Sequence, residues 1–197
     1  MNVEDFALEL HRIGGVKFGE FTLKSGRKSP IYVDLRGLVS HPKVLRMAGE
    51  ALADVLRGLE FDRIAGLPYA GLPLAVSASL AADLPMLYAR KEAKEYGTKR
   101  RIEGDYAPGQ TVALLDDVIT DGGAKLELAE PFREEGLAVR DFVVLVDREQ
   151  GGRQALAQHG YRLHAVFTLR EVLEALHRRG AIPEETYRAV SDYLAAA

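Results

Sequence analysis

The stretch that decides the fold is Val112-Ala113-Leu114-Leu115-Asp116-Asp117-Val118-Ile119-Thr120-Asp121-Gly122-Gly123-Ala124. Its first four residues are apolar, which predicts a short buried strand. Two carboxylates are expected to follow the end of that strand, and a Gly-Gly pair then precedes a helical pattern. Backbone N–H groups at a helix N-terminus bind phosphate, and glycine lets a ligand come close to the backbone. Carboxylates beside such a loop suit the hydroxyls of a ribose or a metal-bound sugar.

The same residue types also have a simpler interpretation. An acidic pair followed by two glycines can merely end a strand and cap a helix, so the residue types alone leave both interpretations open. Two other phosphate-binding patterns are excluded, because the chain contains neither Gly-x-x-x-x-Gly-Lys-Ser/Thr nor Gly-x-Gly-x-x-Gly.

Strand and helix patterns alternate on both sides of this stretch. Strands are expected at Phe21–Leu23, Ile31–Leu35, Arg63–Leu67, Pro85–Tyr88, Thr111–Leu115, Asp141–Val146 and Arg162–Phe167. Helices are expected at Val3–Ile13, from Pro42 to Gly58, and at Leu72–Ala82, Lys125–Glu135, Arg153–His159, Leu169–Arg178 and Glu184–Leu194. The alternation indicates an α/β fold class, with a mostly parallel central sheet flanked by helices. Ligands bind such sheets beyond the carboxyl ends of the strands, so functional residues are expected there.

Composition narrows the class of protein. The 197 residues correspond to one domain, and the net charge of −3 gives no overall basic field for nucleic acid. The absence of cysteine excludes thiol catalysis and cysteine zinc sites. No apolar run is long enough for a membrane span, and the acidic residues at 2–5 do not fit a signal peptide. We expect a cytoplasmic protein with no membrane partner. The five histidines show no metal-binding spacing.

Three further segments carry charge where ligands are expected. In Arg90–Arg101, six of twelve residues are basic, which fits either a solvated surface loop or a lid that brings cations to a pyrophosphate. Phe18–Asp34 predicts a hairpin with a cationic tip, which is often simply polar. Arg148 follows a strand, where it can bind a carboxylate bidentately or form a salt bridge with Asp147 or Glu149.

The amino-acid motifs in these segments resemble those of the orotate phosphoribosyltransferases. The stretch at 112–124 is similar to the phosphoribosyl pyrophosphate motif of type I phosphoribosyltransferases. Arg90–Gly97 resembles the flexible catalytic loop of the orotate enzymes, and Phe21–Pro30 resembles their N-terminal signature. Asp147–Gly152 looks like their orotate-binding arginine segment, and Gly66–Gly71 looks like the pyrophosphate loop of the fold.

The resemblance implies an architecture and an activity. It implies one phosphoribosyltransferase domain over 1–197, with a small N-terminal hood from about 1–35 and a flexible catalytic loop at 90–110. The implied reaction transfers the phosphoribosyl group from phosphoribosyl pyrophosphate to N1 of orotate, as in pyrimidine biosynthesis. Mg²⁺ is the implied cofactor, held mainly by the substrate diphosphate with no protein metal ligand. The implied partners are the two small-molecule substrates and a second copy of the chain, with loop residues reaching across the homodimer.

The resemblance also implies roles for individual residues. The implied catalytic residues are Arg90, Lys91, Lys94, Asp116 and Asp117: the first three contact pyrophosphate, and the two acids hold the ribose hydroxyls. Thr120 to Ala124 hold the 5′-phosphate, and Thr120 also lies near the base. The remaining implied substrate contacts are Lys24, Tyr32, Val33, Tyr96, Val118, Ile119 and Arg148, of which Arg148 binds the orotate carboxylate.

Four positions depart from patterns found in relatives. Tyr96 stands where some have His, Val33 where an aromatic residue is common, and Ala70 where some have Lys. Asp121 places an acid inside the phosphate loop, so its carboxylate is expected to point away from the phosphate. Two alternatives stay open: a purine-type phosphoribosyltransferase, and a regulator that binds phosphoribosyl pyrophosphate without catalysis.

Overall fold

A six-stranded sheet forms the centre of the molecule. The structure, a computed structural model, describes residues 2–22, 26, 28–90 and 101–196. The strand order is β5-β4-β3-β6-β7-β8, and only the edge strand β5 runs antiparallel to its neighbour. The bounds are β3 Arg63–Gly66, β4 Met86–Ala89, β5 Ile102–Glu103, β6 Thr111–Ile119, β7 Ala138–Asp147 and β8 Arg162–Thr168. The predicted mostly parallel sheet is confirmed.

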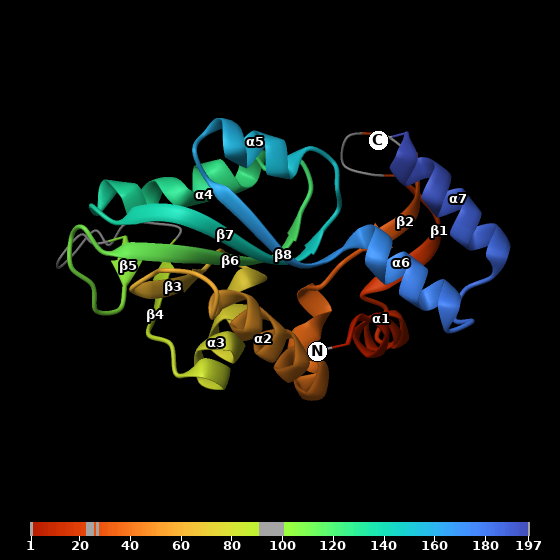
Figure 1. The fold of residues 1–197 in the computed structure, drawn as a ribbon, viewed down its shortest axis with the longest axis horizontal. Helices are drawn as coiled ribbons and strands as arrows, with labels where there is room; N and C mark the ends of the chain where they lie inside the picture. The colour runs from red at the N-terminus through yellow and green to blue at the C-terminus, as the bar shows by residue number, and fades with distance from the viewer. Residues whose placement is uncertain (1, 23–25, 27, 91–100, 197) are drawn as a thin grey trace.

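Helices cover both faces of this sheet (Figure 1). On one face lie α2 (Pro42–Leu56) and α3 (Gly71–Ala82), and on the other lie α4 (Gly123–Glu134) and α5 (Gly152–Gln158). The alternation of side chains along β6 explains the two layers. Ala113 and Leu115 join the core under α2 and α3, whereas Val112 and Leu114 join the core under α4 and α5.

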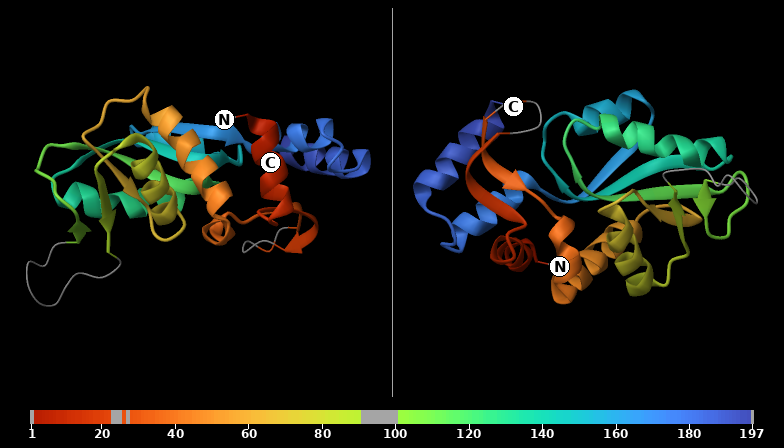
Figure 2. Two further views of the ribbon diagram at one scale, coloured as in Figure 1. Left: turned by 90° about the horizontal axis from the view of Figure 1, so that it is seen from below. Right: turned by 180° about the vertical axis from the view of Figure 1, so that it is seen from behind.

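A second, smaller layer lies beside the sheet and combines both ends of the chain (Figure 2). It contains α1 (Val3–Arg12), the antiparallel pair β1 (Val16–Thr22) and β2 (Lys28–Val33), and the helices α6 (Leu169–Arg178) and α7 (Glu184–Ala195). Phe6 of α1 stacks on Phe167 at the end of β8, with ring centroids 5.4 Å apart. The hood expected from residues 1–35 therefore also includes the two C-terminal helices. A short 3-10 helix, Arg36–Ser40, connects it to α2.

Several element predictions were wrong. The strands predicted at Phe21–Leu23 and Ile31–Leu35 are β1, which begins at Val16, and β2, which spans Lys28–Val33. The strand predicted at Thr111–Leu115 continues to Ile119, so Asp116 and Asp117 lie within β6 and not after its end. The pairing of β6 with β7 explains this, because it extends through Asp116, opposite Val144, to Ile119, opposite Asp147. The segment predicted as an irregular loop between β4 and β6 contains the short strand β5, which pairs with the end of β4. Among the described residues, no helix is long and apolar enough to cross a membrane.

Candidate active site

The acidic pair lies at the carboxyl-terminal part of β6, and its two members differ in environment. Asp116 is 5% exposed, and both of its carboxylate oxygens are occupied. One oxygen accepts the N–H of Asp117 at 2.8 Å, and the other pairs with the ammonium group of Lys125 in the first turn of α4. Asp117 accepts the N–H of Val118 at 2.7 Å through one oxygen, and its other oxygen accepts no hydrogen bond from the described residues.

Burial and charge change the protonation of Asp117. Burial raises the pKa of Asp117 from its usual 3.8 to about 6, and the neighbouring charge of Asp116 adds to this effect. The ammonium group of Lys125 acts in the opposite direction but does not outweigh them. Asp117 is therefore the member of the pair with a free acceptor oxygen. Its surroundings disfavour the ionised form of its carboxyl group.

The loop after β6 has the geometry of an anion-binding turn. Gly122 caps α4 with a φ of 86°, a conformation that favours glycine. A Cβ atom at Gly122 would also lie 3.2 Å from the carbonyl oxygen of Gly152, so the two loops approach closely here. Asp121 does not simply point away from the turn, because its Oδ1 accepts the N–H of Gly123 at 3.0 Å. One backbone donor of the loop is thus taken by this carboxylate.

Arg148 follows β7 and differs from the other described charged groups in its hydrogen bonding. Its Nε and Nη2 atoms are buried and have no hydrogen-bond partner, and within the described residues only the hydroxyl of Tyr193 shares this condition. Burial lowers the pKa of Arg148, as expected for a cation without a counter-charge. An unpaired buried cation is costly for the free protein, which indicates that a ligand completes the site.

Neither predicted salt-bridge partner neutralises Arg148. Asp147 pairs with Arg153 at 3.4 Å and also accepts the N–H of Glu149 at 2.8 Å. Glu149 lies 3.8 Å from Arg170. Since both neighbouring carboxylates are engaged elsewhere, the alternative in which Arg148 forms a local salt bridge is wrong.

The backbone ties the arginine loop to the end of β6. The N–H of Arg148 donates to the carbonyl oxygen of Ile119 at 3.0 Å, and the N–H of Gly152 donates to that of Thr120 at 2.9 Å. A Cβ atom at Gly152 would lie only 2.6 Å from Ile119, so only glycine fits this approach. The structure therefore brings Arg148 and Thr120, which were predicted to lie near the base, together with Ile119, which was predicted as a substrate contact.

The loop after β3 reaches the same edge of the sheet. A Cβ atom at Gly71 would lie 2.4 Å from the carbonyl oxygen of Leu115 and 3.2 Å from the carboxylate of Asp116, so the start of α3 lies directly against the acidic pair. Beside this loop is a cavity of about 220 Å³ lined by Pro68, Tyr69, Ala89, Arg90, Arg101, Glu127, Leu128 and Pro131. Arg90 thus shares a cavity with the predicted pyrophosphate loop, although its guanidinium donates to Glu103 at 3.1 Å.

The hood contributes a further group of predicted site residues. Tyr32 of β2 stacks on Phe21 of β1 with ring centroids 5.4 Å apart, and Val33 packs against the main core. Arg36 donates two hydrogen bonds of 2.7 Å to Asp34. Those bonds are the main cause of the raised pKa of Arg36, and the charges of Tyr32 and Asp117 contribute further. The charge of Asp117 therefore acts on the loop after β2.

Four predicted site residues are not described by the structure, and one residue beside the acidic pair was missed from the sequence. Lys24, Lys91, Lys94 and Tyr96 lie outside the described residues. Lys125 was not singled out from the sequence, although a lysine one turn after a Gly-Gly pair was a possible signal. In the part of the chain that the structure describes, no group of three or more His, Asp or Glu side chains could hold a metal ion.

Comparison with known proteins identifies the family. No protein-family model matches the chain. It is 43% identical over 193 residues to the orotate phosphoribosyltransferase of Caenorhabditis elegans, covering 97% of this chain and 85% of that protein. The chain belongs to the orotate phosphoribosyltransferase family. It is also 46% identical to the uridine 5'-monophosphate synthase of Bos taurus, over 94% of this chain but only 39% of that protein.

The chain is also similar in fold to solved structures of orotate phosphoribosyltransferases. The uridine monophosphate synthase of Leishmania donovani superposes with a TM-score of 0.91 at 41% identity, over all of this chain and 43% of that one. The orotate phosphoribosyltransferase of Aeropyrum pernix gives a TM-score of 0.75 at 34% identity, over 90% of this chain and 99% of that one. The chain thus matches the whole of some relatives and less than half of others.

Proposed function

We propose that this chain transfers the 5-phosphoribosyl group from phosphoribosyl pyrophosphate to N1 of orotate, giving orotidine 5'-phosphate and pyrophosphate. The observation that carries the proposal is that the Nε and Nη2 atoms of the Arg148 guanidinium are buried and have no hydrogen-bond partner. A planar guanidinium binds a carboxylate bidentately, and orotate has a carboxylate that purine bases lack. Membership of the orotate phosphoribosyltransferase family supports the same reaction.

The acidic pair and the turn after it position the ribose phosphate. Asp117 has a free carboxylate oxygen for a ribose hydroxyl, whereas Asp116 needs Lys125 to release one oxygen before it can do the same. The turn from Thr120 to Ala124 holds the 5'-phosphate at the start of α4. The N1–C1 bond forms, N1 gives up its proton to water, and the C1–O bond to pyrophosphate breaks. Positive charge develops on the sugar next to these carboxylates as the C1–O bond breaks.

The leaving group is placed at the cavity between the β3 loop and Arg90. The backbone N–H of Tyr69 and the guanidinium groups of Arg90 and Arg101 are described donors that line this cavity. We propose that Mg²⁺ enters with the diphosphate, because the described residues offer no cluster of three metal-binding side chains. Bound there, Mg²⁺ would supply charge neutralisation for the departing pyrophosphate.

The test is a base-selectivity assay on the purified chain. Loss of orotate absorbance is followed with phosphoribosyl pyrophosphate and Mg²⁺, with adenine, hypoxanthine and uracil as competing bases. Turnover of orotate alone, abolished by removing Mg²⁺, is the expected result. Turnover of a purine and not of orotate would establish the purine-type alternative. Binding of phosphoribosyl pyrophosphate without turnover of any base would establish the regulator alternative.

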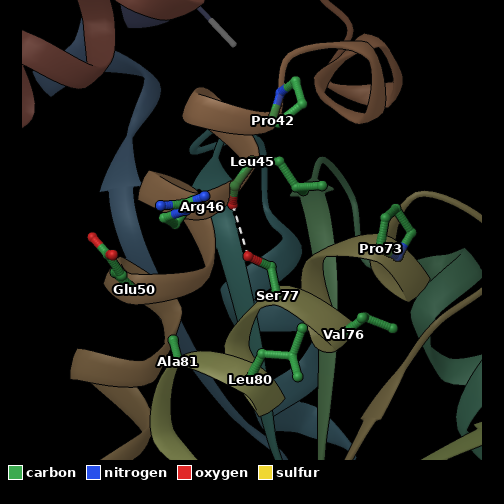
Figure 3. Close-up of a pocket in the computed structure, with 9 residues that line it drawn as sticks. All are labelled: Pro42, Leu45, Arg46, Glu50, Pro73, Val76, Ser77, Leu80 and Ala81. Carbon is green, nitrogen blue, oxygen red and sulfur yellow. Dashed lines mark hydrogen bonds between the residues drawn. The ribbon is translucent and has the colours of Figure 1, made fainter.

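We further propose that the chain acts as a homodimer through the groove between α2 and α3 (Figure 3). The groove has a volume of about 420 Å³ and exposes apolar side chains of α3, including Leu80 at 82% and Val76 at 47%. Arg46 and Glu50 border it from α2, and neither forms an ion pair within the described part of the chain. A two-fold axis that passes between Arg46 and Glu50 would place Arg46 of one copy opposite Glu50 of the other, which would make this face complementary to itself.

Charge reversal tests the dimer directly. Arg46→Glu should convert the dimer to a monomer in light scattering after size exclusion, and Arg46→Glu combined with Glu50→Arg should restore it. Leu80→Glu should also give a monomer, and because Leu80 is exposed this change should leave thermal stability of the monomer intact. Dimers in all three variants, or a monomeric wild type, would exclude this surface.

A further inference from the structure

The second unpartnered buried group in the structure belongs to the C-terminal helix. Tyr193 of α7 has a buried hydroxyl without a hydrogen-bond partner, and among the described residues only the two nitrogens of Arg148 share that condition. The two residues are 45 positions apart in the sequence, at the end of β7 and near the end of α7. Both belong to elements around the predicted base site, because α7 packs on β2, and ionisation of Tyr193 would act against the lowering of the Arg148 pKa by burial.

The chemistry of these unpaired buried donors defines the ligand that they need. A guanidinium has donors only, and a phenol hydroxyl donates one hydrogen bond at neutral pH. No hydrogen bond joins Arg148 to Tyr193, so the hydroxyl has not been used to satisfy the guanidinium. A group with several acceptor lone pairs would satisfy both at once, and a carboxylate has about four.

The packing of α7 fixes the phenol in place. Val190 and Leu194 on the same helix are buried at 0% and 7% exposure, and Tyr193 itself packs against the main core. The helix also packs on β2, the strand that carries Tyr32 and Val33. A hydroxyl held this way is oriented before the substrate arrives, which reduces the entropy lost on binding.

We propose that Tyr193 donates a hydrogen bond to the orotate carboxylate beside Arg148, so that the C-terminal helix forms one wall of the base site. This inference rests on the proposed orotate transfer and adds a residue that the motifs did not contain. It also gives the C-terminal helices a role in base recognition, in addition to completing the core of the hood.

Removal of the hydroxyl tests the assignment. Tyr193→Phe should raise the KM for orotate roughly ten- to a hundredfold, the effect of losing one hydrogen bond to a charged group. The KM for phosphoribosyl pyrophosphate and kcat at saturating orotate should change less than about twofold, because Tyr193 is not assigned to either. Tyr187→Phe is the matched control, since Tyr187 lies on the same helix and stacks on His177, away from Arg148. It should leave all three constants unchanged.

The outcomes separate this inference from the reaction itself. A wild-type chain without orotate turnover contradicts the proposed function. An active wild type with an unchanged orotate KM in Tyr193→Phe overturns the role of Tyr193 alone. A variant in which both KM values and kcat deteriorate together, with a lower melting temperature, also overturns it, because that pattern reports general disruption of the helix.

Discussion

The two ends of β7 differ in whether a buried charged group has hydrogen-bond partners. Near its start, Asp141 is 1% exposed and fully satisfied: Arg162 donates two hydrogen bonds of 2.8 Å, and the His164 ring nitrogen lies 2.8 Å away. Just after its end, Arg148 has two buried nitrogens without any partner. Both charges lie on the same strand and its immediate continuation, so burial alone does not explain the difference.

This difference distinguishes charged groups that stabilise the fold from charged groups that bind a ligand. Ligands of parallel sheets bind beyond the carboxyl ends of the strands, and at that edge a closed ion pair would compete with the ligand. At the opposite edge no ligand is expected, so an unpaired charge would only destabilise the fold. The Asp141 cluster should therefore contribute to stability without affecting catalysis, and Arg148 should do the reverse.

The largest expected effect is that of Arg148→Gln. Truncating a buried, charge-paired contact in a complex costs about 2–5 kcal/mol, so kcat/KM for orotate should fall roughly 10²–10³-fold. The KM for phosphoribosyl pyrophosphate should stay near the wild-type value. Without substrate, the melting temperature should not decrease, since the variant removes an unpaired buried charge. A clear loss of stability would mean that Arg148 is structural and would remove the contrast between the two ends of β7.

The complementary change is Asp141→Ala. It removes the acceptor of three hydrogen bonds in a buried position, so the free energy of unfolding in urea should decrease by about 2–4 kcal/mol. At 25 °C, kcat and both KM values should remain within about twofold of the wild type. A selective rise of the orotate KM would show that the amino-terminal end of β7 also acts in the base site.

Asp117 extends the comparison between the two edges of the sheet. It lies at the ligand-binding edge, where burial and Asp116 disfavour its negative charge. Its pKa of about 6 in the folded chain lies above the ordinary 3.8. The stabilisation from this raised pKa is therefore complete below pH 4 and is lost as pH rises through 6. Asp117→Asn should be more stable than the wild type by about 1–3 kcal/mol at pH 7.5, with no difference near pH 3.5.

Thermal melts across this pH range check the prediction for Asp117, with Asp62→Asn as an exposed control. The same variant should lose most of its turnover, because the carboxylate is assigned to the ribose. Wild-type kcat/KM for phosphoribosyl pyrophosphate should also decrease below pH 6, as Asp117 becomes protonated. Equal stability of wild type and variant at pH 7.5 would contradict the unfavourable environment of this carboxylate.

The sequence predicted the layered α/β fold and the segments around the site, because both follow from local patterns of apolar residues, carboxylates and glycines. It placed Asp116 and Asp117 after the strand, since a strand that continues through two acids is recognisable only when Lys125 and the pairing with β7 are seen. It also offered a salt bridge for Arg148 that Arg153 and Arg170 prevent by binding the neighbouring acids. Tyr193 could not be found, because the burial of its hydroxyl without a partner depends on how the last helix packs.

The smallest expected effect concerns Asp121, a negative charge at the edge where an anion should bind. Its carboxylate accepts the N–H of Gly123, so it both repels a phosphate and occupies one of the donors. Asp121→Asn removes the charge but keeps an oxygen that can accept this bond. A charge near a helix N-terminus is worth about 0.3–1 kcal/mol, so the KM for phosphoribosyl pyrophosphate should fall roughly two- to fivefold at low salt. The gain should shrink at high salt, and a rise in KM would instead indicate that Asp121 orients the turn for the phosphate.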